Sequence, residues 1–310
     1  MGDSVNIAAI DIGSNAIRMA ISTWQDGVLH PVERLRTPIR LGKDVFGTGK
    51  ISKDNISAVS ETFQFYQQLI DDHEVSMVRA TATSAAREAK NQLQFVTHVR
   101  NESGIAIEVI EAQEEARLIQ KAVEQKLNLE NRNALIMDIG GGSVEFIALS
   151  NREIQGIQSF KMGTVRALKA CERSGDSIKS FIYSFGNELE SFIKSHLESV
   201  DVIIGTGGNI ESMGRLRCSL FTKRNPHRIR RKEVTELMRS MMPLSAKERE
   251  VAFNLRKDRV DVILPALRTV KLLMKSTNLD LLEIPRVGLR DGITLDLLDQ
   301  WQKNPKSYRK

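Results

Sequence analysis

The sequence ALIMDIGGGSVEFIAL, residues 134–149, predicts two apolar strands joined by a turn of three glycines. Asp138 ends the first strand, Ser143 adds a hydroxyl donor, and Glu145 follows two residues later. Glycine has no Cβ, so backbone N–H groups in this turn can come close to an anion. Two flanking carboxylates would suit a phosphate held together with Mg²⁺. A glycine-rich hairpin without a ligand is the alternative, because short glycine motifs are weak signals.

The same pattern occurs near the N-terminus in IAAIDIGSNAIRMAI, residues 7–21. Asp11, Gly13, Ser14 and Asn15 lie there between two apolar runs. The two copies are too far apart in the chain for a solenoid repeat. We therefore expect a duplicated domain, with one phosphate-binding hairpin in each half and a cleft between the halves.

A third glycine turn occurs in IIGTGGNIESM, residues 203–213, after another apolar run. Its glycines lead into a predicted helix that Asn209 is expected to cap. The N–H groups at the start of that helix would again point toward an anion.

Strands and helices alternate along both halves, which argues for α/β domains. Helices are predicted over residues 52–72 and 178–196, among others. A short polar segment at 127–133 separates the halves. The predicted domains are residues 1–127 and 128–310, with the last helix able to pack back on the first domain.

Composition limits the class of protein and of partner. The chain has 310 residues, 41% hydrophobic and 27% charged, as in a globular protein with a large core. No apolar run is long enough to span a bilayer, and the N-terminus does not resemble a signal peptide. Cys171 and Cys218 have no metal-ligand spacing, so we expect reduced thiols and a cytoplasmic protein.

The charge of the chain favours an acidic partner. The net charge is +6, but aromatic residues make up only 5% of the sequence. Stacking platforms for single-stranded nucleic acid are therefore scarce, and phosphate is a better expectation than bases. We expect neither nucleic acid nor a membrane as partner.

Together these motifs resemble the exopolyphosphatase and guanosine pentaphosphate phosphatase family, within the superfamily of sugar kinases, actin and heat-shock ATPases. The resemblance covers nearly the whole chain and rests on AAIDIGSNAIRM, ATATSAAREAKN, EEARLI, MDIGGGSVEF, KMGTVR, GTGGNIESM, RVDVILPA and VGLRDGI. It implies two ribonuclease-H-like (actin-like ATPase) domains with an interdomain cleft, in the family's short two-domain form.

The resemblance makes Glu115 the general base, near the start of a predicted helix. Phosphoryl transfer depends mainly on positioning and charge neutralisation, so a carboxylate that orients water can suffice. The alternative is a first-turn glutamate that only complements the helix dipole. Glu111 and Ala112 depart from the family's pattern before the EEA motif, and Glu114 is the neighbouring candidate.

The resemblance also assigns Asp138 and Glu145 as metal-associated carboxylates, for Mg²⁺ or a similar divalent ion. The residue patterns and the resemblance together give these phosphate-binding positions: Asp11, Gly13, Ser14, Asn15, Arg18, Arg87, Gly140, Gly141, Gly142, Ser143, Gly207 and Gly208. Further candidates for substrate contact are His227, Arg228 and Arg259. The alternative for the basic positions is a solvated surface charge.

The resemblance implies a phosphohydrolase that releases terminal orthophosphate from inorganic polyphosphate by metal-assisted attack of water. Guanosine pentaphosphate is the alternative substrate. A non-catalytic sensor that binds a guanosine polyphosphate is the rival of a different class. The sequence leaves open whether the protein is a homodimer.

Overall fold

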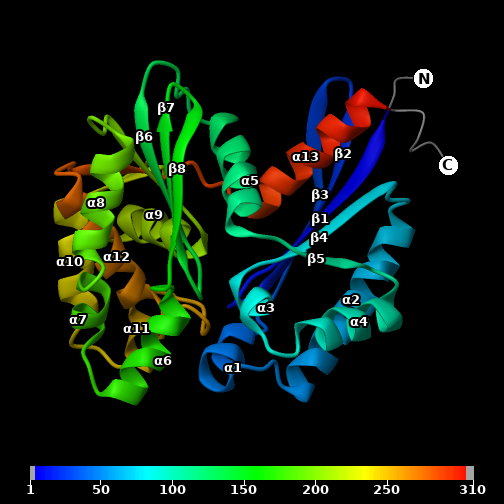
Figure 1. Ribbon diagram of the computed structural model, residues 1–310, viewed down its shortest axis with the longest axis horizontal. Helices are drawn as coiled ribbons and strands as arrows, with labels where there is room; N and C mark the ends of the chain where they lie inside the picture. The colour runs from blue at the N-terminus through cyan, green and yellow to red at the C-terminus, as the bar shows by residue number, and fades with distance from the viewer. Residues whose placement is uncertain (1–3, 305–310) are drawn as a thin grey trace. The chain divides into compact units, whose positions relative to one another are not determined.

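Residues 4–304 are described in the computed structural model of the chain (Figure 1). They form two compact α/β units, one of residues 4–122 with 287–304 and one of residues 123–286. The predicted second domain, 128–310, therefore differs from the second unit, because the last helix belongs to the first unit. Among the described residues no helix is long and apolar enough to cross a membrane.

The first unit is built on a five-stranded sheet in the order β3-β2-β1-β4-β5. Its strands are β1 (Val5–Ile12), β2 (Ile17–Gln25), β3 (Val28–Thr37), β4 (Met77–Ala82) and β5 (Ile107–Val109). The first three form an antiparallel meander, and β4 and β5 extend the sheet in parallel from β1. β1 is nearly continuously apolar because it is the central strand and is buried along its length.

Six helices accompany this sheet among the described residues: α1 (Leu41–Thr48), α2 (Lys53–Asp72), α3 (Ser84–Glu88), α4 (Gln92–Ser103), α5 (Ala112–Glu124) and α13 (Leu289–Lys303). Ser52 caps α2 by accepting a hydrogen bond from Asn55 N–H. α13, from the far end of the chain, packs on β1, β2 and β4.

The second unit has a six-stranded sheet in the order β10-β11-β9-β6-β7-β8. Its strands are β6 (Asn133–Ile139), β7 (Val144–Ser150), β8 (Glu153–Phe160), β9 (Val202–Thr206), β10 (Arg228–Arg230) and β11 (Leu281–Glu283). Again three strands form an antiparallel meander, and β9 and β11 extend it in parallel from β6. The two sheets thus share one plan, as the repeated sequence pattern predicts, and β10 is an added antiparallel edge.

The helices of the second unit are α6 (Thr164–Ser174), α7 (Ile178–Tyr183), α8 (Gly186–His196), α9 (Gly208–Leu220), α10 (Arg231–Met241), α11 (Ala246–Ala252) and α12 (Ile263–Ser276). The single helix predicted over 178–196 is wrong, because the chain breaks between α7 and α8. Phe185 at the break packs edge-on against Phe160 and Phe181, and the Ser184 hydroxyl donates to Phe181 O.

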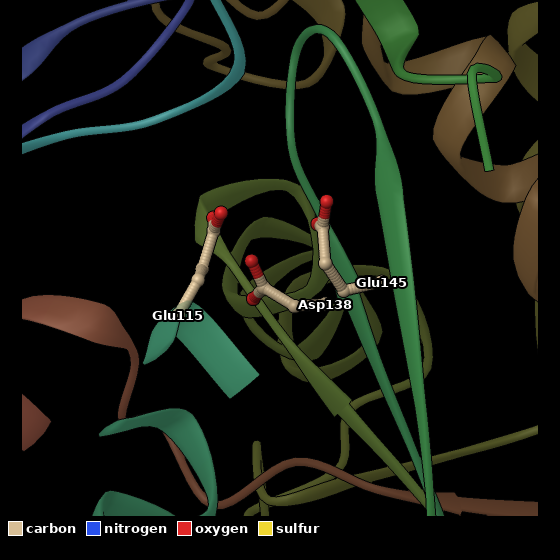
Figure 2. Close-up of side chains that lie close together, drawn as sticks. All are labelled: Glu115, Asp138 and Glu145. Carbon is tan, nitrogen blue, oxygen red and sulfur yellow. The ribbon is translucent and has the colours of Figure 1, made fainter. Parts of the chain in front are cut away.

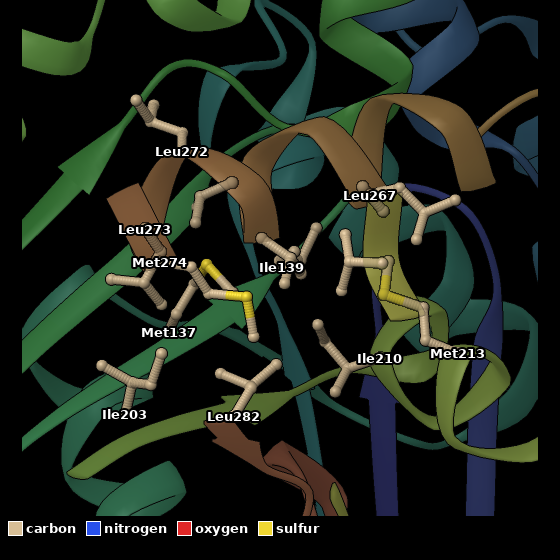
Figure 3. Packing of buried hydrophobic residues seen from close by; sticks show 14 of the residues in the cluster. Met137, Ile139, Ile203, Ile210, Met213, Leu267, Leu272, Leu273, Met274 and Leu282 are labelled. Carbon is tan, nitrogen blue, oxygen red and sulfur yellow. The ribbon is translucent and has the colours of Figure 1, made fainter. Parts of the chain in front are cut away.

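A continuous hydrophobic core supports the β6–β9 part of this sheet. Figure 3 shows Met137 and Ile139 of β6 among side chains of α12, including Leu267 and Leu273. All four are 3% exposed or less. β6 therefore presents its last polar residue, Asp138, from a strand whose neighbours are fixed by close packing.

In the first unit a network of ion pairs ties α13 to α5 and β4. Glu114 accepts hydrogen bonds from Arg79 Nη2 at 2.8 Å and Arg117 Nε at 2.7 Å. Asp296 of α13 accepts from Arg79 Nη1 at 3.0 Å and from Arg117 Nη2 at 2.8 Å. Two arginines thus bridge segments that are far apart in the sequence.

The network makes stability depend on pH. The hydrogen bond from Arg117, together with that from Arg79, lowers the pKa of Glu114 from 4.5 to about 2, although partial burial opposes the shift. A carboxyl group whose pKa is lower in the folded state stabilises the fold above its unfolded pKa and loses that effect as pH falls through the folded value. We expect Glu114→Gln to lower the Tm at about pH 6, and the difference from the parent to shrink as pH falls from about 4.5 toward 2.

Thermal unfolding across this pH range measures the effect. Glu108→Gln is the matched control, because Glu108 also pairs with Arg79 but its side chain is 53% exposed; its effect should be smaller. A Tm difference for Glu114→Gln that stays constant down to about pH 2 would contradict this origin of the stability.

Candidate active site

The glycine turn of the second unit is held from one side by the segment at 163–166. The bonds are Thr164 N–H to Gly140 O at 3.1 Å, Val165 N–H to Gly141 O at 2.8 Å, and Arg166 Nε to Gly142 O at 2.6 Å. In a planar trans peptide the C=O group and the N–H group that follows it point in opposite directions. The N–H groups of these three peptides therefore point away from 163–166, which is the arrangement of an anion-binding turn.

Gly163 allows this close approach. A Cβ atom at this position would lie 2.3 Å from Gly142 C and from Ser143 N, and these are backbone atoms that cannot swing aside. Sequence reasoning assigned no role to Gly163 or Arg166. The available signal was the KMGTVR motif, which contains both residues.

Asp138 and Glu145 lie opposite each other on the paired strands β6 and β7 (Figure 2). Each offers a carboxylate oxygen, and these two oxygens lie within 4.8 Å of each other. Glu145 is buried and its Oε1 accepts hydrogen bonds from Ser143 Oγ at 2.5 Å and Ser159 Oγ at 3.0 Å. Asp138 Oδ1 accepts a hydrogen bond from the Thr206 hydroxyl. Hydroxyl groups thus fix both carboxylates, and Ser159 and Thr206 join the candidate site although the sequence analysis gave them no role.

This donor set fits a divalent metal. Both groups are hard oxygen donors on neighbouring strands, and Mg²⁺ is commonly bound by one or two carboxylates with phosphate oxygens completing the shell. Hydrogen bonds to the carboxylates are the kind of outer contact that orients metal ligands. Asp138 and Glu145 could therefore hold the ion that the sequence analysis expects.

The third glycine turn lies beside Asp138. Gly207 has φ of 92°, a conformation that favours glycine, and it forms the N-cap of α9. A Cβ at Gly207 would lie 2.8 Å from Ile139 O and 3.3 Å from Asp138 Oδ1. The prediction that Asn209 caps this helix is wrong. Asn209 is inside α9 and is buried, and its Oδ1 accepts a hydrogen bond from Arg259 Nη1 at 3.0 Å.

The first-unit hairpin is fixed by α1 and α3. Ser14 O accepts a hydrogen bond from Gly42 N–H at 2.8 Å, and Ser14 Oγ lies 3.1 Å from Ser84 Oγ. Gly13 N–H donates to Ala16 O at 3.1 Å, which closes the turn.

The duplicated hairpins differ at one equivalent position. Asp11 lies opposite Arg18, and Arg18 Nη1 donates to Asp11 Oδ2 at 3.0 Å. Asp138 instead lies opposite Glu145. In the first hairpin the charge of the carboxylate is therefore neutralised by an arginine. In the second hairpin two carboxylates lie opposite each other, and of the two hairpins only this one has the pair of carboxylates that suits a cation.

Glu115 and Arg87 come together inside the first unit. Arg87 Nη1 lies 3.7 Å from Glu115 Oε2 and donates to Ile110 O. The side chains are 18% and 8% exposed, so Arg87 is not a solvated surface charge. Glu115 N–H donates to Glu111 O, which shows a regular first helical turn despite the unusual residues before the EEA motif.

Arg259 is buried, at 4% exposure, and the alternative of a solvated helix face is wrong for it. His227 and Arg228 are exposed at the start of β10. In the same basic run, Arg231 Nη2 donates to Met274 O at 2.8 Å and to Leu279 O at 2.9 Å. Arg231 therefore supports the fold, and only part of this run is available to a ligand.

These features define a phosphatase with the two-sheet α/β fold of actin-like ATPases. The model of the Ppx/GppA phosphatase family matches residues 20–301, and the chain belongs to this family, whose members hydrolyse phosphoanhydride bonds.

Three similar proteins illustrate the family. Exopolyphosphatase 2 of Mycobacterium tuberculosis is 27% identical over 94% of this chain and 98% of its own length. A guanosine-5'-triphosphate,3'-diphosphate pyrophosphatase of Vibrio parahaemolyticus is 22% identical over 98% of this chain, which spans 61% of that protein. The crystal structure of the Aquifex aeolicus family member is 26% identical, with a TM-score of 0.78 over 96% of this chain and 99% of its own.

Gly163→Ala should displace the glycine turn, because the added methyl group meets backbone at 2.3 Å. We expect a loss of about 1–3 kcal/mol in stability and a raised KM for the phosphate substrate. Gly186→Ala is the control, since its Cβ would lie at an ordinary 3.5 Å from Leu272. Thermal unfolding and steady-state kinetics measure the two effects. A Gly163→Ala variant with the parent's KM would show that the turn does not hold substrate.

Chelation should abolish phosphate release, and Mg²⁺ should restore it. Asp138→Asn, Glu145→Gln and Ser159→Ala should each raise the Mg²⁺ concentration for half-maximal activity by about tenfold or more. Glu198→Gln, on the exposed surface of the same unit, is the control. If chelator leaves the rate unchanged, the two carboxylates have a structural role only.

Proposed function

We propose that this protein is an exopolyphosphatase that removes terminal orthophosphate from inorganic polyphosphate. The observation that carries the proposal is the pairing of the buried Glu115 with Arg87 in a member of the Ppx/GppA phosphatase family. The first choice of polyphosphate is supported by the higher identity to the exopolyphosphatase relative, which is 27%, against 22% for the pyrophosphatase relative.

In the proposed reaction, backbone N–H groups and an arginine side chain bind phosphate groups of the substrate. The turn at 140–143 binds phosphate oxygens through its N–H groups, and Arg87 pairs with phosphate oxygens through its planar guanidinium group. When bound, a divalent ion at Asp138 and Glu145 would neutralise charge on the phosphoryl group.

Glu115 would orient a water molecule for attack on the terminal phosphorus and accept its proton. The O–P bond that forms is to this water, and the bond that breaks releases the shortened phosphate chain. Glu114 is poorly suited to the same role, because its carboxylate is engaged by Arg79 and Arg117.

Guanosine pentaphosphate is the second candidate substrate, because the pyrophosphatase relative matches 98% of this chain. Its terminal phosphoanhydride is chemically equivalent to that of polyphosphate.

The exposed His227 and Arg228 would contact the distal part of a long polyphosphate chain. The sensor alternative is less well supported, because the chain belongs to a family whose members hydrolyse phosphoanhydride bonds.

Glu115→Gln should lower kcat by about 10²–10⁴-fold, the usual effect of removing a positioned base. Glu114→Gln is the matched control, and its kcat should stay within a few-fold of the parent. Substrate affinity should change little in Glu115→Gln, since other groups hold the phosphates. Near-normal turnover of Glu115→Gln would exclude it as the base.

The substrate is tested by measuring orthophosphate released from inorganic polyphosphate and from guanosine pentaphosphate by the same preparation. A higher kcat/KM for polyphosphate supports the proposal. Release from guanosine pentaphosphate alone would favour the second candidate, and release from neither would favour a sensor.

A further inference from the structure

The second unit contains a cavity of about 400 Å³ along one face of α9. It is formed by α9 residues and by the segment at 253–259. Its charged lining residues are Glu211, Arg215, Arg256 and Arg259. Ser212, Ser219 and Asn254 add polar groups. Three arginines face a single glutamate, so the lining of the cavity is positively charged.

The fold gains little from this concentration of positive charge. Arg215 lies 3.9 Å from Glu211 Oε2, and Arg256 lies 3.8 Å from Asp258 Oδ1. Both arginine side chains are 51% exposed. Ion pairs at such distances contribute little to stability when one partner is half-exposed, as each arginine is here.

The positive charges of neighbouring arginines disfavour the charged form of Arg215. Partial burial, with the positive charges of Arg256 and Arg286, lowers the pKa of Arg215, although Glu211 acts in the opposite direction. An anion with several charges would relieve this repulsion, and the planar guanidinium group is well suited to phosphate oxygens.

The cavity begins next to the third glycine turn. Arg259, in its wall, donates to Asn209 Oδ1 at 3.0 Å, and Asn209 follows the turn at Gly207 and Gly208 directly. From Glu211 to Ser219 the wall runs along α9 for about 12 Å, at 1.5 Å per residue. The cavity therefore extends away from the position of Asp138 and has the length of an extended ligand rather than of a single phosphate ion.

We propose that Arg215 and Arg256 form an anion-binding pocket for phosphate groups of the substrate that lie beyond the one being removed. The ligand chemistry is a group of contiguous phosphates, which either inorganic polyphosphate or a guanosine polyphosphate supplies. The choice of ligand rests on the proposed function, but the pocket acts in binding and takes no part in the chemical step.

The test is equilibrium binding in the presence of chelator, where metal-assisted hydrolysis is absent. Inorganic polyphosphate and guanosine pentaphosphate are titrated by calorimetry into the whole protein, at several salt concentrations. The variants are Arg215→Ser with Arg256→Ser, and Glu211→Gln. Arg239→Ser, an exposed arginine on α10, is the matched control.

The double arginine variant should bind polyphosphate about tenfold more weakly, because two charge-assisted contacts are lost. The slope of log affinity against log salt should fall by about one for each arginine removed, a change that a merely structural defect would not produce. Glu211→Gln should bind more tightly than the parent, because it removes the only carboxylate among the residues that line the cavity.

Weakening that is confined to guanosine pentaphosphate would support the pocket and identify the nucleotide as its ligand. The proposal would be overturned if the double variant bound both ligands with the same affinity and the same salt slope as the parent. Weaker binding by Glu211→Gln would also overturn it. The proposed function is tested separately, by phosphate release in the presence of metal and by the Glu115→Gln variant. Binding in chelator tests only the pocket, so failure of one proposal can be told from failure of the other.

Discussion

The site of the second unit depends on the hydrogen bonds that segment 163–166 makes to the carbonyl groups of the glycine turn. These bonds fix the planes of three successive peptides. In each peptide plane the N–H group points opposite to the C=O group. Hydrogen bonds that fix the C=O groups on one side of the turn therefore also fix the direction of the N–H groups on the other side. A preorganised set of donors needs no rearrangement when negative charge develops on a phosphoryl group, which is the main source of electrostatic catalysis.

The two duplicated hairpins have the same backbone plan but carry different pairs of charged residues at equivalent positions. Arg18 faces Asp11 in the first copy, whereas Glu145 faces Asp138 in the second. The first pair is neutral as a unit, so it can lie near phosphate without repelling it. The second has a surplus of negative charge, which is favourable only when a cation is bound or when hydroxyl groups stabilise it, as Ser143 and Ser159 do for Glu145.

Two adjacent glutamates of α5 have different surroundings because successive helix residues face different directions. Glu114 joins the arginine network that fastens α13 to the first unit. Glu115 points into buried surroundings beside Arg87. The ion-pair network and the proposed base therefore lie in one helical turn but have different partners.

The sequence by itself determined the α/β class, the duplicated strand–turn–strand pattern and most candidate residues, because glycines, apolar periodicity and motif order report on local backbone. It did not determine that Gly163 and Arg166 support the glycine turn, or that Asn209 binds Arg259 instead of capping a helix. The tertiary structure decided these points, because the partner of a buried polar group depends on which distant segment packs against it.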